Sequence, residues 1–230
     1  MTETKTAELT MAEKGRKQAV LFDMDGTLID TECYYRVCWP KALAEFGYHM
    51  TDEQALAMRS LGRPFAPELL RKWFGDELDY AAVRARRKEL MEEILAREGI
   101  RVKPGAIELL TFLRDRGIIT AVVTATDRER ADRYLERTGL AALFREVISA
   151  TRVREGKPSP DIYLYACECL GMEPADCYAV EDSPNGIWSA YRAGCRVIMV
   201  PDQTQPDEEL SACLYAKADT LHDIRDILGK

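Results

Sequence analysis

The stretch AVLFDMDGT, residues 19–27, decides how this chain folds. Its first four residues form a short, continuous apolar run, which is typical of a strand buried on both faces of a sheet. The run ends at once in Asp23 and Asp25, and Gly26 allows the backbone to turn sharply after them. The sequence therefore predicts a buried strand that ends in two carboxylates.

Four further apolar runs of strand type follow much later in the chain, at residues 118–123, 147–149, 178–180 and 197–200. Helical stretches separate them, each followed by a glycine suited to a helix C-terminus, at residues 127–138, 160–170 and 184–193. Strands and helices that alternate at this spacing form a parallel sheet covered on both faces. We expect an α/β, Rossmann-like core.

The stretch between Thr31 and Val102 carries helix signals and no strand signal. Its prolines (Pro40, Pro64 and Pro67) indicate several short helices rather than one long one. We expect an inserted all-α cap domain over residues 33–101, with the core formed by residues 18–32 and 102–230. Residues 1–17 are expected to be a flexible tail, and the two joints of the cap, near residues 31–35 and 99–103, to be hinges.

Composition excludes several functions. The formal charge is −7, from 32 Lys and Arg against 39 Asp and Glu. Because the sequence has no basic surplus or basic stripe, a nucleic-acid partner is disfavoured. With only two histidines, multi-His zinc sites are excluded and acid–base chemistry falls to carboxylates. No stretch approaches the length of a membrane span, and seven scattered cysteines without a CxxC pair favour a reduced, cytoplasmic protein.

The chemically useful residues follow the predicted strands. In an open parallel sheet, functional side chains gather beyond the carboxyl ends of the strands. The residues at these ends are Asp23, Asp25, Thr124, Lys157, Glu181 and Asp182. Together they are suited to hold a divalent cation, or to supply a nucleophile and a proton donor side by side. Taken alone, a DxDG stretch is also common where a loop simply ends a strand.

Four motifs in fixed order remove that ambiguity. They are FDMDGTLIDTE (22–32), VVTAT (122–126), GKPSPDIY (156–163) and VEDSPNGIWSA (180–190). With them the chain resembles the haloacid dehalogenase-like phosphohydrolases, and among these the members with a helical cap that are related to β-phosphoglucomutase. The pattern covers residues 20–202, and four ordered motifs are far more specific than any one.

The resemblance implies a role for each carboxylate. Asp23 would attack phosphorus and form an aspartyl-phosphate, while Asp25 would protonate the leaving alcohol and later take a proton from water. The side chains of Asp23 and Asp182, with the main-chain carbonyl of Asp25, would hold Mg²⁺, and Glu181 would lie in or just behind that shell.

The resemblance also implies a phosphate-binding set. The hydroxyl of Thr124, the backbone at Ala125 and the ammonium of Lys157 would contact the transferring phosphoryl group. Arg63, in the cap loop 61–64, is a candidate contact to a second polar or anionic group of the substrate; a solvated cap arginine is the alternative. Mg²⁺, Lys157 and one proton on Asp25 together offset four carboxylate charges, so a near-neutral site can accept a phosphate dianion.

We therefore expect a Mg²⁺-dependent phosphatase that acts on a small phosphorylated metabolite, with a sugar phosphate as one option. The first alternative is a mutase related to β-phosphoglucomutase. It is disfavoured because Tyr35 stands where those mutases carry His. The second is a non-catalytic regulator that binds a phosphorylated metabolite, disfavoured because every charged partner is retained. The expected partners include no nucleic acid and no membrane, and a monomer is favoured although the sequence does not determine oligomeric state.

Overall fold

A central parallel sheet organises the molecule. In this computed structural model, which describes residues 18–229, six strands lie in the order β3-β2-β1-β4-β5-β6 with all pairs parallel. The expected flexible tail, residues 1–17, lies outside the described residues. The strands are β1 (Ala19–Phe22), β2 (Ile119–Thr124), β3 (Glu146–Ser149), β4 (Cys177–Glu181), β5 (Arg196–Met199) and β6 (Ala216–Lys217).

The strand β1 lies at the point where the strand order reverses. Phe22 pairs with Val122 of β2 on one side and with Val180 of β4 on the other. The chain continues outward from β1 in both directions, so the carboxyl end of β1 opens into the crevice where ligands bind in such sheets. This position places Asp23 between the ends of β2 and β4.

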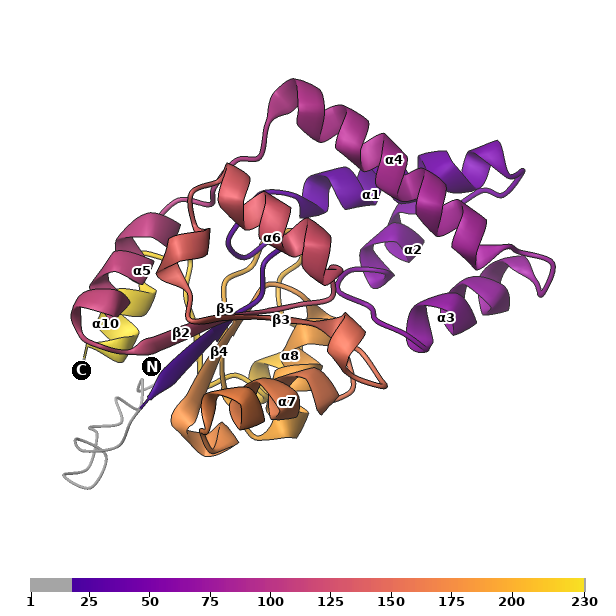
Figure 1. Cartoon of the computed structure of the whole chain (residues 1–230). Helices are drawn as coiled ribbons and strands as arrows, with labels where there is room; N and C mark the ends of the chain where they lie inside the picture. The colour runs from indigo at the N-terminus through magenta and orange to yellow at the C-terminus, as the bar shows by residue number, and fades with distance from the viewer. Residues whose placement is uncertain (1–17, 230) are drawn as a thin grey trace.

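Helices cover both faces of the sheet (Figure 1). Two apolar clusters fill the space beneath them, one including Leu109, Leu113 and Ala131, the other Ile162 and Ile187. The helices of the core are α5 (Ala106–Asp115), α6 (Arg128–Arg137), α7 (Asp161–Leu170), α8 (Pro184–Ala193), α9 (Glu208–Ala212) and α10 (Ile224–Leu228). Short 3₁₀ turns span Ala141–Leu143, Ala150–Arg152 and Pro174–Asp176.

The segment between β1 and α5 is helical and packs around an apolar cluster of its own. Its helices are α1 (Glu32–Glu45), α2 (Asp52–Ala57), α3 (Phe65–Phe74) and α4 (Tyr80–Glu98). Trp39, Leu43, Leu70 and Val83 are buried within it. An α/β core with an inserted all-α cap is therefore confirmed as the fold class. The proposed domain boundaries, residues 33–101 for the cap and the remainder for the core, stay a prediction.

Two details differ from the sequence-based expectation. Pro40 lies inside α1 rather than between two helices. Its missing N–H removes one helical bond, but burial of Trp39 and Leu43 against the rest of the cap keeps the helix continuous. The strand β6 was not predicted, because two residues at a sheet edge leave no apolar run in the sequence.

The two segments that join cap and core are paired with each other. The Asp30 N–H donates to the Arg101 carbonyl (2.8 Å), the Lys103 N–H donates to the Leu28 carbonyl (2.9 Å), and Ile29 bridges Val102 in antiparallel fashion. The two connecting segments would therefore move together if the cap moved relative to the core. Their role as hinges remains a prediction.

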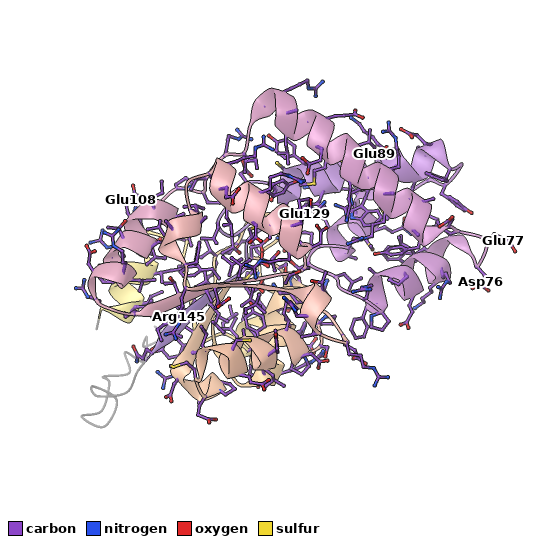
Figure 2. All side chains as sticks on the ribbon, in the orientation of Figure 1. Asp76, Glu77, Glu89, Glu108, Glu129 and Arg145 are labelled. Carbon is purple, nitrogen blue, oxygen red and sulfur yellow. The ribbon has the colours of Figure 1, made fainter. Side chains whose placement is uncertain are left out.

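The acid excess divides between surface and interior. Figure 2 labels several acidic side chains, and all of them are exposed: Asp76, Glu77, Glu89, Glu108 and Glu129. By contrast, Asp23, Glu181 and Asp182 are at most 1% exposed. Because buried carboxylates are costly unless they are compensated, the second group calls for a specific explanation.

Leu109 and Leu164 test the packing of the core. Leu109 in α5 is fully buried, whereas Leu164 in α7 is 44% exposed. We expect Leu109→Ala to lower the free energy of unfolding by about 3 kcal/mol, and Leu164→Ala to change it by less than about 0.5 kcal/mol. Urea denaturation measures both. Equal effects would contradict the assignment of these faces.

Asp127 links the core to the cap through an ion pair, and this pair makes a pH-dependent contribution to the stability of the fold. Partial burial raises its pKa, but the Lys88 ammonium of α4 (2.8 Å) and the Arg130 guanidinium outweigh this and hold the pKa at about 2, below the usual 3.8. A carboxyl group whose pKa is lower in the folded than in the unfolded protein stabilises the fold at pH values above its unfolded pKa. This stabilisation is lost as the pH falls through the folded pKa.

We expect Asp127→Asn, which can still cap α6, to lower the free energy of unfolding by about 1 kcal/mol at pH 7. This loss should shrink between pH 4 and pH 2. Urea unfolding at both ends of that range measures it; a constant difference would contradict the ion pair.

Candidate active site

Three buried carboxylates meet at the carboxyl ends of two adjacent strands. Asp23 follows β1, while Glu181 ends β4 and Asp182 follows it. One oxygen from each lies within 4.8 Å of the others. The parallel register of β1 and β4 brings them together, as the sequence analysis expected from the strand ends.

Lys157 is the cation that joins two of these carboxylates. Its ammonium donates to Asp23 Oδ1 (2.5 Å), to Glu181 Oε1 (2.6 Å) and to the Val123 carbonyl (3.0 Å). The side chain is fully buried. Burial lowers the pKa of Lys157, but the attraction of Asp23 and Glu181 outweighs it and holds the pKa above its usual value. The ammonium therefore stays charged at neutral pH.

The remaining carboxylate oxygens fit a divalent cation. Asp23 Oδ2 and Glu181 Oε2 are buried without a hydrogen-bond partner among residues 18–229. Burial raises the pKa of Asp23 well above its usual value, and Glu181 and Asp182 add to the rise although Lys157 opposes it. Burial likewise raises the pKa of Asp182 to about 6. Negative charge thus exceeds positive charge here, and carboxylate oxygens are the ligands that hard cations such as Mg²⁺ prefer.

Asp25 is held apart from this group. Its Oδ1 accepts from the Thr31 hydroxyl (2.6 Å) and its Oδ2 accepts from the Thr126 hydroxyl (2.8 Å). The residue lines a cavity between core and cap that also reaches Asp23. Its carboxyl group therefore faces the same cavity as Asp23, and the acid–base role expected for it stays a prediction.

Two glycines make room for the carboxylates. A Cβ at Gly186, in the first turn of α8, would lie 1.9 Å from Glu181 Oε2. A Cβ at Gly26 would lie 2.5 Å from Asp182 Oδ2, and Gly26 also has a positive φ of 88°. The turn of the DMDGT stretch and the start of α8 are therefore shaped around the acidic group.

Two of the predicted phosphate-binding residues, Thr124 and Ala125, lie at the end of β2, and the third, Lys157, lies in the loop before α7. Thr124 is fully buried, and its hydroxyl oxygen accepts from the Thr126 N–H (3.0 Å), which leaves its proton available for donation. Ala125 and Thr126 line the cavity. Thr126 was not predicted as a site residue, although it belongs to the VVTAT motif.

The cavity has a volume of about 270 Å³ and is lined by both core and cap. The cap loop rests directly on the loop that carries Lys157: the Gly62 N–H donates to the Lys157 carbonyl (2.8 Å), and the Gly156 N–H donates to the Arg63 carbonyl (2.7 Å). A Cβ on either Gly62 or Gly156 would lie within 3 Å of the other residue's Cα. Arg63 lines the cavity with an exposed side chain, so its predicted substrate contact remains a prediction.

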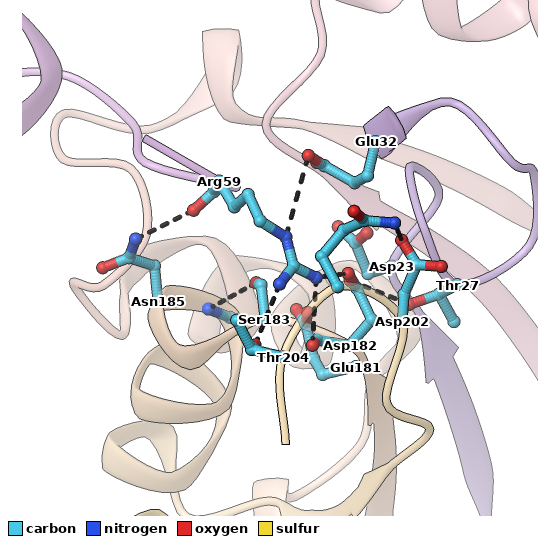
Figure 3. Close-up of polar contacts among 12 residues, drawn as sticks. Asp23, Thr27, Glu32, Arg59, Glu181, Asp182, Ser183, Asn185, Asp202 and Thr204 are labelled. Carbon is cyan, nitrogen blue, oxygen red and sulfur yellow. Dashed lines mark hydrogen bonds and ion pairs between the residues drawn. The ribbon is translucent and has the colours of Figure 1, made fainter. Parts of the chain in front are cut away.

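A second cap arginine, Arg59, reaches the acidic group and was not foreseen. Its guanidinium forms an ion pair with Asp182 and lies 3.8 Å from Glu32 Oε2, and it donates to the Thr204 hydroxyl at 2.9 Å (Figure 3). Arg59 is only 3% exposed. From sequence alone, a single arginine outside a motif is predicted to be exposed to solvent. Only the packing of the cap on the core reveals this contact.

Comparison with known proteins agrees with this geometry. Over residues 17–194 the chain matches the model of the haloacid dehalogenase-like hydrolase family. It belongs to this family. The resemblance drawn from the four motifs is thereby confirmed.

Individual relatives refine the comparison. The chain is 36% identical over 206 residues to hexitol phosphatase A of Escherichia coli, covering 87% of this chain and 92% of that protein. The crystal structure of CbbY from Rhodobacter sphaeroides in complex with phosphate matches with a TM-score of 0.76 at 29% identity, over 91% of this chain and 96% of that one. β-Phosphoglucomutase from Clostridium difficile, at 18% identity, shares the fold with a TM-score of 0.79 over 93% and 96% of the two chains. The chain is therefore a haloacid dehalogenase-like hydrolase of the phosphatase type.

None of the helices within residues 18–229 has the length and apolar character needed to cross a membrane.

Gly186 tests how tightly the acidic group is built. Alanine normally stabilises a helical position by about 1 kcal/mol relative to glycine. Here the added Cβ would displace the Glu181 carboxylate from Lys157, so we expect Gly186→Ala to destabilise the protein by about 2 kcal/mol. Urea unfolding measures the change, and a gain in stability would contradict the clash.

Proposed function

We propose that this hydrolase cleaves a small phosphomonoester in a Mg²⁺-dependent reaction through an aspartyl-phosphate on Asp23. The observation that carries the proposal is the pairing of two differently held carboxyl groups at one cavity. Asp23 is fixed by Lys157 and has one oxygen free, while Asp25 is held by two hydroxyl groups.

The first step transfers the phosphoryl group to the protein. A carboxylate oxygen of Asp23 forms a bond to phosphorus as the bond from phosphorus to the leaving oxygen breaks, and Asp25 gives that oxygen a proton. Lys157 keeps Asp23 oriented. The Thr124 hydroxyl and the backbone N–H groups after β2, including that of Ala125, are suited to donate to the phosphoryl oxygens.

The second step regenerates the enzyme. Asp25, now ionised, takes a proton from a water molecule whose oxygen attacks phosphorus, and the bond between Asp23 and phosphorus breaks. The hydrogen bonds from Thr31 and Thr126 hold the Asp25 carboxyl group in one place through both steps. Because the same group donates and then accepts, one positioned carboxyl serves both halves of the reaction.

Mg²⁺ would be held by the side chains of Asp23, Glu181 and Asp182 and by the main-chain carbonyl of Asp25. When bound, it neutralises the carboxylates and the phosphoryl oxygens, which lowers the cost of bringing an anion to this site. The free oxygens of Asp23 and Glu181 and the raised pKa values of Asp23 and Asp182 support this assignment. The free oxygen of Glu181 favours direct ligation over a supporting role.

Residue 35 favours hydrolysis over phosphosugar isomerisation. Burial raises the pKa of Tyr35, and its hydroxyl lies 3.2 Å from that of Thr126 and accepts from Arg130 (3.1 Å). A neutral phenol offers none of the proton exchange that a histidine at this position would supply.

We also propose that the reaction takes place in the cytoplasm, since all seven cysteines are free thiols.

Substitution of the two aspartates tests the mechanism. We expect Asp23→Asn to abolish phosphate release and Asp25→Asn to lower kcat by about 10²- to 10⁴-fold, the usual contribution of a positioned acid–base group. Phosphate release from a panel of phosphorylated metabolites measures both, with the exposed Asp219→Asn as the control. EDTA should stop the reaction and Mg²⁺ restore it. Turnover by Asp23→Asn at the wild-type rate would refute the proposal.

A further inference from the structure

Two buried arginines that line the cavity keep hydrogen-bond donors that no group of the described chain uses. Arg87 in α4 and Arg130 in α6 both line the cavity, and each is 4% exposed. In both, Nε and Nη1 are buried without a hydrogen-bond partner in the described part of the chain. Free donors on two buried guanidinium groups at one small cavity are unusual, because buried polar and charged groups are normally paired.

The surroundings hold Arg87 in place without neutralising it. Its guanidinium carbon lies 4.7 Å from the ring centre of Tyr35 and 4.9 Å from that of Trp39. These aromatic rings support the flat group but supply no carboxylate. Burial accordingly lowers the pKa of Arg87 from its usual value, and Arg84 and Arg130 add to this.

Arg130 has one long ion pair, and its Nε and Nη1 donors stay free. Its Nη2 donates to the Tyr35 hydroxyl (3.1 Å), and the closest carboxylate, Asp127, lies 3.9 Å away. Asp127 in turn accepts from Lys88 at 2.8 Å. Asp127 is therefore shared between Lys88 and Arg130, and its contact with Arg130 is the longer of the two.

A chain of contacts leads from Asp25 to both arginines. Asp25 bonds to Thr126, the Thr126 hydroxyl lies 3.2 Å from that of Tyr35, and Tyr35 contacts both Arg130 and Arg87. Asp25 is the group that would protonate the leaving oxygen. The part of the substrate beyond that oxygen is thus directed toward the arginines.

We propose that the leaving-group end of the substrate carries a second anionic group, a carboxylate or a phosphate, which Arg87 and Arg130 bind. A guanidinium matches either anion with two parallel hydrogen bonds, and the free donors of both residues are available for them. This proposal rests on the proposed phosphatase function and names the class of substrate for the same site.

Matched substrates measure the preference directly. One pair is 3-phosphoglycerate and glycerol 3-phosphate, which differ by a carboxylate in place of a hydroxymethyl group. The other is the bisphosphate and the monophosphate of propane-1,3-diol, which differ by a phosphate. We expect the wild-type enzyme to favour the anionic member of at least one pair by about 30-fold in kcat/KM, and the pair that shows the preference identifies the anion.

Variants assign the preference to the arginines. Arg87→Met and Arg130→Met should each lower the ratio of kcat/KM within the preferred pair by about tenfold, and Arg87→Lys should retain part of it. Arg86→Met is the matched control: Arg86 neighbours Arg87 on α4 but forms ion pairs with Glu45 and Glu89 at the surface, so the ratio should not change. A purely structural role would lower both rates alike and leave the ratio intact.

The outcomes separate the two proposals. Ready hydrolysis with a ratio near one in both pairs, or a ratio unaffected by Arg87→Met and Arg130→Met, overturns the inference and leaves the phosphatase function standing. Absence of magnesium-dependent turnover on every substrate contradicts the phosphatase function and this inference with it. Thermal unfolding shows whether each variant is folded; if Arg87→Met is not, the wild-type ratio and Arg130→Met still decide.

Discussion

The ion pairs of Lys157 with Asp23 and Glu181 are the interaction on which this structure depends. All three side chains are fully or almost fully buried, and they come from three separate segments of the chain. Removing one partner of such a group leaves an uncompensated buried charge, which is far more costly than losing a surface ion pair. The ends of β1 and β4 and the loop after β3 are therefore tied to one ammonium group. The same contacts orient Asp23 toward the cavity, so stability and chemistry depend on the same atoms.

The cap completes the site by close contact of backbones. Gly62 and Gly156 approach so closely that no side chain fits between them, and two hydrogen bonds join their loops. Because one of these bonds ends on the carbonyl of Lys157, the position of the cap is coupled to the residue that orients Asp23. The cap also brings Arg59 to Asp182 and Arg87 to the wall of the cavity. The core thus contributes the acidic group around Asp23, and the cap contributes much of the cavity lining.

The distribution of charge explains how an acidic protein binds an anion. Most of the acidic excess is on the surface, where water solvates it. Inside, three carboxylates gather around Asp23, whereas several arginines line the cavity that Asp23 reaches. The net charge of −7 therefore says little about the ligand. What matters is the local field within the cavity, where low dielectric strengthens each interaction.

The sequence by itself determined five of the six strands, the order of the motifs and the catalytic candidates, because apolar runs and strand-end residues are local patterns. Asp23, Asp25, Lys157, Glu181 and Asp182 were identified in this way, since parallel strands always bring their carboxyl ends to one edge. The segment RARRK, residues 84–88, shows where this reasoning stops. Arg86 pairs with surface glutamates, Arg87 is buried against Tyr35 and Trp39, and Lys88 reaches Asp127 in the core. Neighbouring cations of the same kind have different roles because only the packing of the cap on the core decides which face of α4 meets the cavity.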